Sequence, residues 1–341
     1  MKIFIDIGHP AHVHYFRNFI KIMTNRGHEF LITARDKEVT HSLLNYYNIP
    51  YISRGKGRNG YLGKALYILE ADYKLYKIAK KFNPDLFLSF GSAYAAHVSK
   101  LLGKPHIAFD DTDHAKYEHL LYVPFTDHIF TPIFYKKDFG KKHKRFNGIM
   151  ELCYLSPRFL NFDETIQGND RHIFIRLSGW RASHDFGYRI NHIRIELVEN
   201  VLKLSEQYSI LISSEDTLPS ELEKFRLSIH PAQLHKYLFN SILCLTEGGT
   251  IANECSLLGV PNILVNPIAK YVGVHQYLKN LGLQEYVDNF SEAFNLLNYY
   301  LVNIKNLNNN IKKQRDKFLR QSIDVNDFLI NLVEQYPKSI K

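Results

Sequence analysis

The stretch Ile242–Pro267, ILCLTEGGTIANECSLLGVPNILVNP, decides the fold of this chain. Its first four residues, Ile242–Leu245, are apolar and long enough for a buried strand, and a Thr-Glu-Gly-Gly turn follows them. Thr250–Leu258 has the spacing of a helix, which the Gly-Val-Pro at 259–261 ends, and Ile263–Val265 is apolar again. A strand, glycine turn, helix and second strand in this order predict one βαβ unit of a parallel sheet.

The two glycines of this stretch stand where the predicted helix begins. Gly248 and Gly249 let a ligand approach the backbone, and the free N–H groups and dipole of a helix N-terminus favour phosphate. Glu254 lies one turn further on, on the same side as Thr250, and can accept hydrogen bonds from a ribose diol. The candidate donor-binding residues of this stretch are therefore Glu247, Gly248, Gly249, Thr250 and Glu254. The alternative is a plain tight turn and a solvated glutamate, because a Gly-Gly turn alone is weak support.

The spacing of the segment G-G-T-I-A-N-E-C-S-L-L-G-V-P resembles the donor-nucleotide segment of GT-B glycosyltransferases. The similarity is greatest with the enzyme that adds N-acetylglucosamine to the lipid-linked peptidoglycan precursor, whose pattern is G-A-L-T-V-x-E followed by seven residues to a proline. The glutamate of that pattern binds the ribose of UDP, and Glu254 falls on it without a gap. Non-hydrolysing UDP-N-acetylglucosamine 2-epimerases share the fold and a similar G-G-x-x-x-E segment, but theirs is one residue shorter to the proline.

Length and composition predict two domains and anionic ligands. The chain has 341 residues, 45% of them hydrophobic, which is ample for two cores. No apolar run reaches the roughly 18 residues that span a bilayer, and the first residues resemble a strand rather than a signal peptide. Three widely spaced cysteines fit neither a zinc site nor a disulfide framework, so we expect a cytoplasmic protein. The net charge of +9 favours anionic partners, and no familiar nucleic-acid motif accompanies it.

The start of the chain predicts a second α/β domain. Lys2–Ile7 is a predicted strand, a helix is expected from about Val13 to Arg26, and the loop and helix start carry His9, His12 and His14. No G-x-G-x-x-G is present, so a dinucleotide site is not predicted.

The three histidines allow three interpretations. A metal site is disfavoured, because His12 and His14 fall on different faces of the helix and no H-E-x-x-H or nearby cysteine supports zinc. A general base is the second, since a histidine in such a loop has a suitable pKa. The third is that His9, His12 and His14 are polar loop residues. The resemblance favours a base, because the peptidoglycan enzyme ends its loop in G-H-V-F-P and A-H-V-H-Y places His12 on a histidine that faces the acceptor. The family's glycine run is replaced here by Gly-His-Pro-Ala.

The run G-H-P-A-H-V-H-Y-F also resembles the opening of a bacterial and archaeal family of GT-B-like proteins long left as a domain of unknown function. The resemblance continues at Asp110–His114 and Gly179–Asp185 and covers most of the chain. It is specific for the family and carries little information on activity.

Three charged segments of the first half remain. Arg54–Lys64 (RGKGRNGYLGK) lacks the G-K-[ST] ending of a P-loop, and we expect a mobile basic edge that meets the acceptor or a membrane. Asp110–His114 follows the predicted strand His106–Phe109, and its Asp111 and Asp113 are candidates for acceptor recognition or for assisting the base. The alternatives there are a Mg²⁺ site, although GT-B enzymes generally need no metal, and a helix N-cap. Lys136–Arg145 is either a solvated face or a dock for an anionic membrane.

The second half carries the remaining donor candidates. Pro157–Asp170 has the composition of a linker, which divides the chain into domains 1–160 and 161–341. Arg176 and Arg181, at the end of the first strand after it, can neutralise a diphosphate, unless they are surface residues beside a turn. The resemblance places His230 near the nucleobase and Gln276 near the donor sugar. The helices from about Ser291 to Gln335 are expected to pack back across both domains.

Together these observations predict an α/β chain of two doubly wound Rossmann-like domains, the GT-B class. The expected activity is transfer of a sugar, without a metal or cofactor, from a nucleotide diphosphate sugar, UDP-linked, to a hydroxyl of a glycan or lipid-linked acceptor in surface polysaccharide or glycolipid synthesis. The stereochemical course is expected to be inverting, with His12 as the leading candidate base. The competing hypotheses are a UDP-sugar 2-epimerase, a non-catalytic nucleotide-sugar or glycan binder, and a basic nucleic-acid-binding protein.

Overall fold

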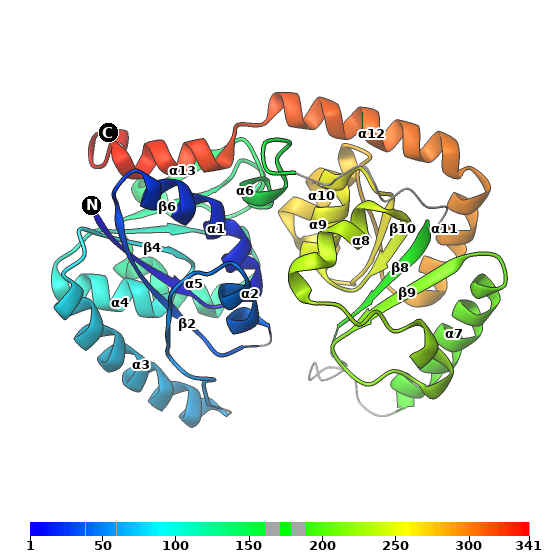
Figure 1. Cartoon of the computed structure of the whole chain (residues 1–341), viewed down its shortest axis with the longest axis horizontal. Coiled ribbons are helices and arrows are strands. Elements are labelled where there is room, and N and C mark those ends of the chain that lie inside the picture. The colour runs from blue at the N-terminus through cyan, green and yellow to red at the C-terminus, as the bar shows by residue number, and fades with distance from the viewer. Residues whose placement is uncertain (38, 59, 161–170, 179–187, 341) are drawn as a thin grey trace. The chain divides into compact units, whose positions relative to one another are not determined.

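The computed structural model describes residues 1–37, 39–58, 60–160, 171–178 and 188–340. The chain forms two compact units. Unit 1 consists of Met1–Tyr154 and Ser322–Lys341, and unit 2 of Leu155–Gln321. Each unit is built on a parallel β-sheet with helices on both faces (Figure 1).

Unit 1 contains a seven-stranded parallel sheet in the order β3-β2-β1-β4-β5-β6-β7. Its strands are β1 (Lys2–Ile7), β2 (Glu29–Ala34), β3 (Ile52–Ser53), β4 (Leu86–Phe90), β5 (His106–Phe109), β6 (His128–Pro132) and β7 (His143–Phe146). The strand order reverses between β1 and β4. Because open α/β sheets bind ligands at the carboxyl ends of the strands where the order reverses, the residues after β1 and β4 are the first place to look for a site.

Helices cover both faces of this sheet. In Figure 1, α1 and α13 lie on one face and α3, α4 and α5 on the other. Both faces are therefore dry, which explains why all five residues of β4, LFLSF, are buried. The helices of unit 1 are α1 (Pro10–Asn25), α2 (Thr40–Tyr46), α3 (Tyr61–Phe82), α4 (Ala93–Leu102), α5 (Lys116–Tyr122), α6 (Leu152–Leu155) and α13 (Val325–Glu334).

Unit 2 contains a five-stranded parallel sheet in the order β12-β11-β10-β8-β9. Its strands are β8 (His172–Leu177), β9 (Ser209–Ser214), β10 (Ser241–Thr246), β11 (Asn262–Val265) and β12 (Glu285–Val287). Its helices are α7 (Tyr188–Ser205), α8 (Leu234–Phe239), α9 (Gly249–Leu258), α10 (Gly273–Asn280), α11 (Phe290–Val302) and α12 (Ile304–Gln321). The order reverses between β8 and β10, so the glycine turn after β10 lies at the reversal.

The core of unit 2 explains why the stretch 242–267 decides the fold. Leu243 and Leu245 of β10 are fully buried, together with Ile173 and Ile175 of the neighbouring strand β8. Each such side chain contributes about 1.5–3 kcal/mol when it leaves water. The predicted strand, helix and strand are confirmed within one or two residues at each end.

The division into units differs from the expected domains 1–160 and 161–341. The last residues, Ser322–Lys341, belong to unit 1. The reason is the apolar face of α13, where the ring of Phe328 lies 5.5 Å from Phe146, 5.6 Å from Phe130 and 6.4 Å from Phe109. The second crossing of the chain therefore comes at residues 321–322, after α12.

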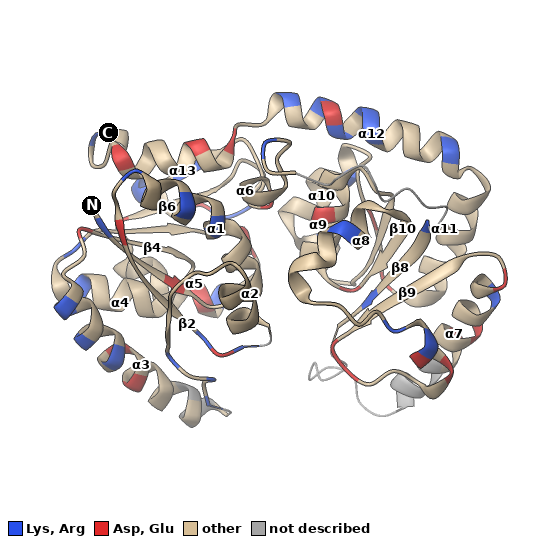
Figure 2. Ribbon diagram, viewed as in Figure 1, with Lys and Arg blue, Asp and Glu red and all other residues tan. Residues whose placement is uncertain are grey.

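Lysine and arginine are spread along outer helices such as α3 and α12, as Figure 2 shows. Among the residues that the structure describes, no helix is both long enough and apolar enough to cross a membrane.

Candidate functional site

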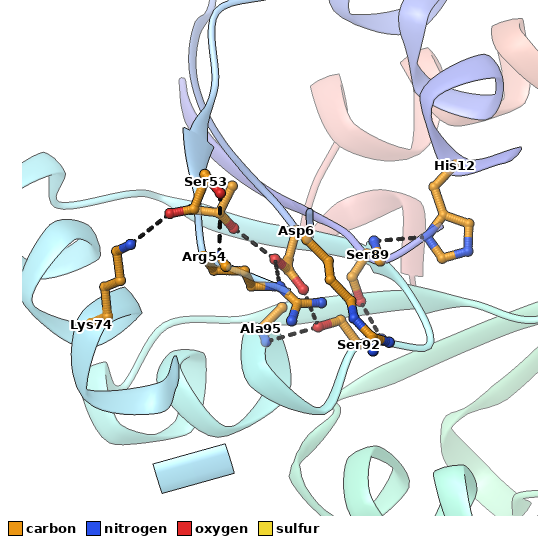
Figure 3. A network of polar contacts seen from close by, with 12 residues as sticks. Asp6, His12, Ser53, Arg54, Lys74, Ser89, Ser92 and Ala95 are labelled. Carbon is orange, nitrogen blue, oxygen red and sulfur yellow. Dashed lines mark hydrogen bonds and ion pairs between the residues drawn. The ribbon is translucent and has the colours of Figure 1, made fainter. Parts of the chain in front are cut away.

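A buried carboxylate organises the carboxyl edge of the sheet in unit 1. Asp6, near the end of β1, is fully buried. Its Oδ1 accepts from Thr33 Oγ1 at 2.7 Å and from Arg54 Nε at 3.0 Å, and its Oδ2 accepts from Ser92 Oγ at 2.6 Å (Figure 3). Because Asp6 and Arg54 are both removed from water, loss of either partner alone costs about 3–5 kcal/mol.

Arg54 is the cation of this pair, and it holds a fixed position. Only 6% of its surface is exposed, its Nη1 donates to the hydroxyl of Tyr67 at 3.2 Å, and the Tyr94 ring lies 4.2 Å from its Cζ. Burial lowers the pKa of Arg54, but Asp6 and the two tyrosines raise it, and the net shift is upward. The expected mobile basic edge is therefore wrong for this residue, which is locked into the sheet edge.

His12 lies beside this pair, on the first turn of α1. It is half-buried, and its ring centroid lies 4.8 Å from that of Phe90 at the end of β4. Burial, followed by the charges of His9, Lys37 and Arg54, lowers its pKa well below the ordinary value. Its Nδ1 accepts the N–H of Gly8 at 3.3 Å. The neutral ring therefore carries its proton on Nε2, which makes His12 a hydrogen-bond donor at that atom.

The other two histidines of the loop have different positions. His9 caps α1, because its Nδ1 accepts the N–H of Ala11 at 3.2 Å, and the helix therefore begins at Pro10 rather than at Val13. His14 is buried and stacks on Tyr154, with ring centroids 5.0 Å apart. The rings of His9 and His12 are 5.9 Å apart.

The carboxylates after β5 divide into two kinds. Asp110 is buried, and its Oδ2 accepts from the hydroxyls of Tyr122 at 2.5 Å and Tyr135 at 3.1 Å and from His119 Nε2 at 2.9 Å. Its oxygens are thus taken up in holding the loop. Burial and the charge of Asp110 raise the pKa of both tyrosines.

Asp111, the next residue of this loop, is a carboxyl group with a raised pKa. Burial and the neighbouring charges of Asp110 and Asp113 raise its pKa to about 7, against the opposing hydrogen bond from Thr112 Oγ1 at 3.1 Å. A carboxyl group that titrates near neutral pH is suited to proton transfer. Asp113, the other candidate of this loop, is buried.

In unit 2, the glycine turn after β10 leads into α9 as the sequence predicted. Thr246 Oγ1 accepts the N–H of Gly248 at 2.9 Å, and α9 begins at Gly249 with no acidic residue in its first turn. A Cβ on Gly249 would lie 2.8 Å from His275 Nε2, so a larger residue has no room there. Thr250 is half-buried on the same turn. The turn therefore keeps a bare backbone at a helix N-terminus.

Glu254 is buried inside unit 2 rather than solvated. It is 3% exposed, and its Oε1 lies 3.0 Å from His235 Nε2, on the neighbouring helix α8. The alternative of a solvated helix residue is therefore wrong. The ribose-binding role of Glu254 stays a prediction.

The remaining donor candidates each have a contact within unit 2. Glu247 Oε2 accepts the N–H of Ser178 at 2.7 Å and so ties the end of β10 to the end of β8. Arg176 donates to Ser213 Oγ at 3.0 Å and to Glu215 at 2.6 Å. Arg181 lies outside the described residues. Two further candidates are held by the backbone, His230 by the N–H of Ala232 and Gln276 by the carbonyl of Lys270.

The basic run Lys136–Arg145 contributes contacts inside unit 1. Lys142 donates to the carbonyls of Val123 and Thr126, and Arg145 donates to that of Lys137 at 2.8 Å. Among the described residues, no group of three or more His, Cys, Asp or Glu side chains is placed to hold a metal ion. A metal-independent reaction stays a prediction.

Two features of the site were not predicted from the sequence. One is the pair Asp6–Arg54, whose only signal was an aspartate inside the apolar run KIFIDI. The other is His235, which meets Glu254 from another helix. Neither partner is near the other in sequence, so no local motif reveals them.

Comparison with known proteins finds a family match over almost the whole chain. A family model described as "Protein of unknown function (DUF354)" matches residues 1–337. The chain belongs to this family. The DUF354 protein is 24% identical over 311 residues to an uncharacterized protein of Methanocaldococcus jannaschii, covering 86% of this chain and 90% of the relative. The predicted family resemblance is thereby confirmed.

Solved structures show the fold of the DUF354 protein. UDP-GlcNAc 2-epimerase from Neisseria meningitidis bound to UDP-GlcNAc has a TM-score of 0.72 at 13% identity, covering 99% of this chain and 100% of that one. MurG from Acinetobacter baumannii has a TM-score of 0.63 at 17% identity, with 98% and 99% covered. The Streptomyces sp. SF2575 glycosyltransferase SsfS6, complexed with thymidine diphosphate, has 0.63 at 13% identity, with 98% and 99% covered. The predicted GT-B class is confirmed.

Proposed function

We propose that this DUF354 protein is a glycosyltransferase. It takes a hexosyl or N-acetylhexosaminyl group from a nucleotide diphosphate sugar, UDP-linked, and transfers it to a hydroxyl of a glycan or lipid-linked acceptor, with inversion and without a metal. The observation that carries the proposal is the glycine turn of unit 2, a bare helix N-terminus at the point where the strand order reverses. Proteins of this fold have been solved with UDP-GlcNAc and with thymidine diphosphate.

In this proposal the donor diphosphate lies against Gly248 and Gly249. The turn carries no side chain at these two positions, and Arg176 stands at the end of the adjacent strand β8, where it adds positive charge. Glu254 accepts the ribose hydroxyls and keeps His235 as its second partner.

Asp111 is the general base of the proposed reaction, in place of His12. A base must be able to lose its proton near neutral pH, and the pKa of about 7 gives Asp111 this property. His12 instead offers a neutral Nε2–H, because its Nδ1 already accepts from Gly8. Asp111 takes the acceptor's hydroxyl proton, the acceptor oxygen bonds to the anomeric carbon, and the bond from that carbon to the diphosphate oxygen breaks. The nucleoside diphosphate leaves with the electron pair, stabilised by the N-terminus of α9.

The test of the nucleotide site is calorimetric titration with UDP, GDP, CDP and CMP. We expect UDP to bind and Glu254→Ala to weaken it by about 1–3 kcal/mol, as for a lost charged hydrogen-bond partner. Glu206→Ala, which removes an exposed acid of the same unit, is the matched control and leaves UDP affinity unchanged. Glu254→Gln keeps an acceptor for His235, so it separates loss of the charge from loss of local structure. If none of the four nucleotides binds, the proposal is wrong.

A UDP-sugar 2-epimerase is the second candidate, since the fold is shared along the full length with such an enzyme. Incubation with UDP-N-acetylglucosamine alone distinguishes the two activities. An epimerase converts the sugar without an acceptor, whereas a transferase releases UDP only slowly. Membrane contact through Lys136–Arg145 is left out of the proposal, because several of these cations bind carbonyls within unit 1.

A further inference from the structure

The loop that begins at Arg54 has a feature that the donor site does not use. Nε and Nη1 of Arg54 are hydrogen-bonded, but Nη2 has no hydrogen-bond partner among the described residues. This atom lies 3.6 Å from the position that a Cβ on Gly8 would occupy. The guanidinium group of Arg54, on a residue more than nine-tenths buried, therefore directs its Nη2 at Gly8, the glycine after β1.

The ring of His12 borders the same glycine. His12 Cε1, the ring atom between the two nitrogens, lies 3.8 Å from the same Cβ position on Gly8. The hydrogen bond from the Gly8 N–H to Nδ1 fixes the ring and leaves the proton on Nε2. Gly8 thus lies beside a buried cation and the Nδ1–Cε1 edge of the His12 ring.

The surroundings of this space suit an anion. Gly8 immediately precedes the N-cap of α1, a helix of 16 residues with no acidic residue in its first turn. Lys37 adds a positive charge within reach of His12. The nearest carboxylate, Asp6, is already occupied by Thr33, Arg54 and Ser92. Arg54 is held in place by this network, so an anion that binds it has little side-chain entropy to overcome.

We infer that Gly8, His12 and Arg54 form a binding site for an oxyanion, a phosphate or carboxylate group carried by the acceptor. The acceptor is then an anionic molecule, either phosphorylated or a sugar acid. The existence of the site rests on the geometry above, and only its assignment to the acceptor rests on the proposed function. The guanidinium edge of Arg54 donates hydrogen bonds that phosphate and carboxylate oxygens accept, and the His12 ring borders the same position.

The test uses the full chain labelled with ¹⁵N-histidine, and the ring signals of His12 report on the site. His12→Gln assigns these signals by their loss. The probes are inorganic phosphate, glucuronate and glucose, titrated at constant ionic strength. We expect one of the two anions to shift the His12 signals with saturation and glucose to leave them unchanged. A response to phosphate identifies a phosphorylated acceptor, and a response to glucuronate identifies a sugar acid.

Gly8→Ala is the decisive variant. Its added methyl group makes only ordinary van der Waals contacts, at 3.6 Å from Arg54 Nη2 and 3.8 Å from His12, so the Asp6–Arg54 pair stays intact. It occupies the space of the anion, and we expect the affinity to fall about tenfold or more. Arg54→Lys keeps the charge and loses the planar fork, and it weakens binding similarly. The control Lys81→Ala removes an exposed cation at the far end of α3 and leaves the affinity unchanged.

The result that overturns the inference is equal anion affinity in the wild type and Gly8→Ala, or no response of His12 to either anion. Titration of UDP into the same samples separates this failure from failure of the proposed function. If UDP binds while His12 ignores both anions, the anion site is wrong and the donor site stands. If the anion binds in a Gly8-dependent manner while UDP does not, the anion site stands and its assignment to a transferase acceptor is wrong.

Discussion

The turns after β1 and after β10 occupy equivalent positions in their sheets, because each lies where the strand order reverses. They differ in which groups surround their glycines. The turn after β1 is lined by side chains, namely Arg54 and His12 on either side of Gly8. The turn after β10 offers backbone alone, because His275 fills the space beneath Gly249. Gly8 has room for a methyl group, and Gly249 has none. In the two proposals above, one topology serves two kinds of anion site, the first set by distant side chains and the second by the helix itself.

The buried acids near the two turns follow the same division. In unit 1, Asp6 pairs with Arg54, whose charge is permanent. In unit 2, Glu254 pairs with His235, whose charge depends on protonation. The first pair holds the guanidinium of Arg54 in one position. The second places the carboxylate of Glu254 beside an imidazole group, which suits the ribose-binding role proposed for it.

The largest expected effect is on the transfer rate. It tests whether unit 1 carries the chemistry while unit 2 binds the nucleotide. Asp111→Asn removes the proposed base, so we expect the transfer rate to fall by about 10²–10⁴-fold while UDP affinity stays the same. In the wild type, kcat/KM rises with pH through about 7, because the base acts only when ionised and its pKa is raised to about 7. Rates measured from pH 5.5 to 8.5 check both points. A variant that retains the wild-type rate and pH profile removes Asp111 from the mechanism.

The next effect compares the two glycines directly. Gly249→Ala brings its Cβ to 2.8 Å from His275 Nε2, and we expect a loss of about 1–3 kcal/mol in the free energy of unfolding, together with weaker UDP binding. Gly8→Ala meets no such contact and should change stability by less than about 0.5 kcal/mol. Denaturant unfolding of the two variants measures the difference. Equal destabilisation would show that the two turns are alike, contrary to the comparison.

The last effect concerns the polar network behind the unit 1 turn. His106 is buried between Ser89 Oγ at 2.9 Å and Thr126 Oγ1 at 3.0 Å, and burial lowers its pKa to about 3. The unfolded chain takes up a proton near pH 6.5 while the native state does not, so stability falls as the pH drops from about 6.5 towards 3. One such group gives at most about 1.4 kcal/mol per pH unit.

His106→Gln removes this titration and should flatten the curve by that slope. Urea unfolding at pH 7, 6, 5 and 4 measures it in the wild type and the variant. Parallel curves for the two proteins would mean that native His106 takes up its proton over the same pH range as in the unfolded chain.

Local patterns predicted most of the fold. The strand at 242–245, the helix at 250–258 and the strand at 263–265 all form, because glycine turns and apolar runs carry their own signal. Patterns could not predict burial set by distant elements. The helix α9 is buried from Ala252 to Leu258, since α8, α10 and α12 pack around it, so Glu254 lies inside.

The candidate site was predicted as a set of positions rather than as a set of roles. His12 and Asp111 do lie at the carboxyl edge of the unit 1 sheet, but their order of importance as bases depends on contacts that no motif encodes. The N–H of Gly8 fixes the tautomer of His12, and Asp110 raises the pKa of Asp111. Arg54 looked like one cation of a basic loop, because its partner Asp6 stands 48 residues earlier.

The return of α13 to unit 1 determines the order in which the protein can be completed during synthesis. The first part of unit 1 emerges from the ribosome before unit 2 but lacks Ser322–Lys341 until those residues have been synthesised. Until then the rings of Phe109, Phe130 and Phe146 have no Phe328 to cover them. Unit 2, a single continuous segment from Leu155 to Gln321, is complete earlier. Unit 1 begins before unit 2 and is therefore completed after it, and a fragment ending at Tyr154 would present an uncovered aromatic surface to chaperones.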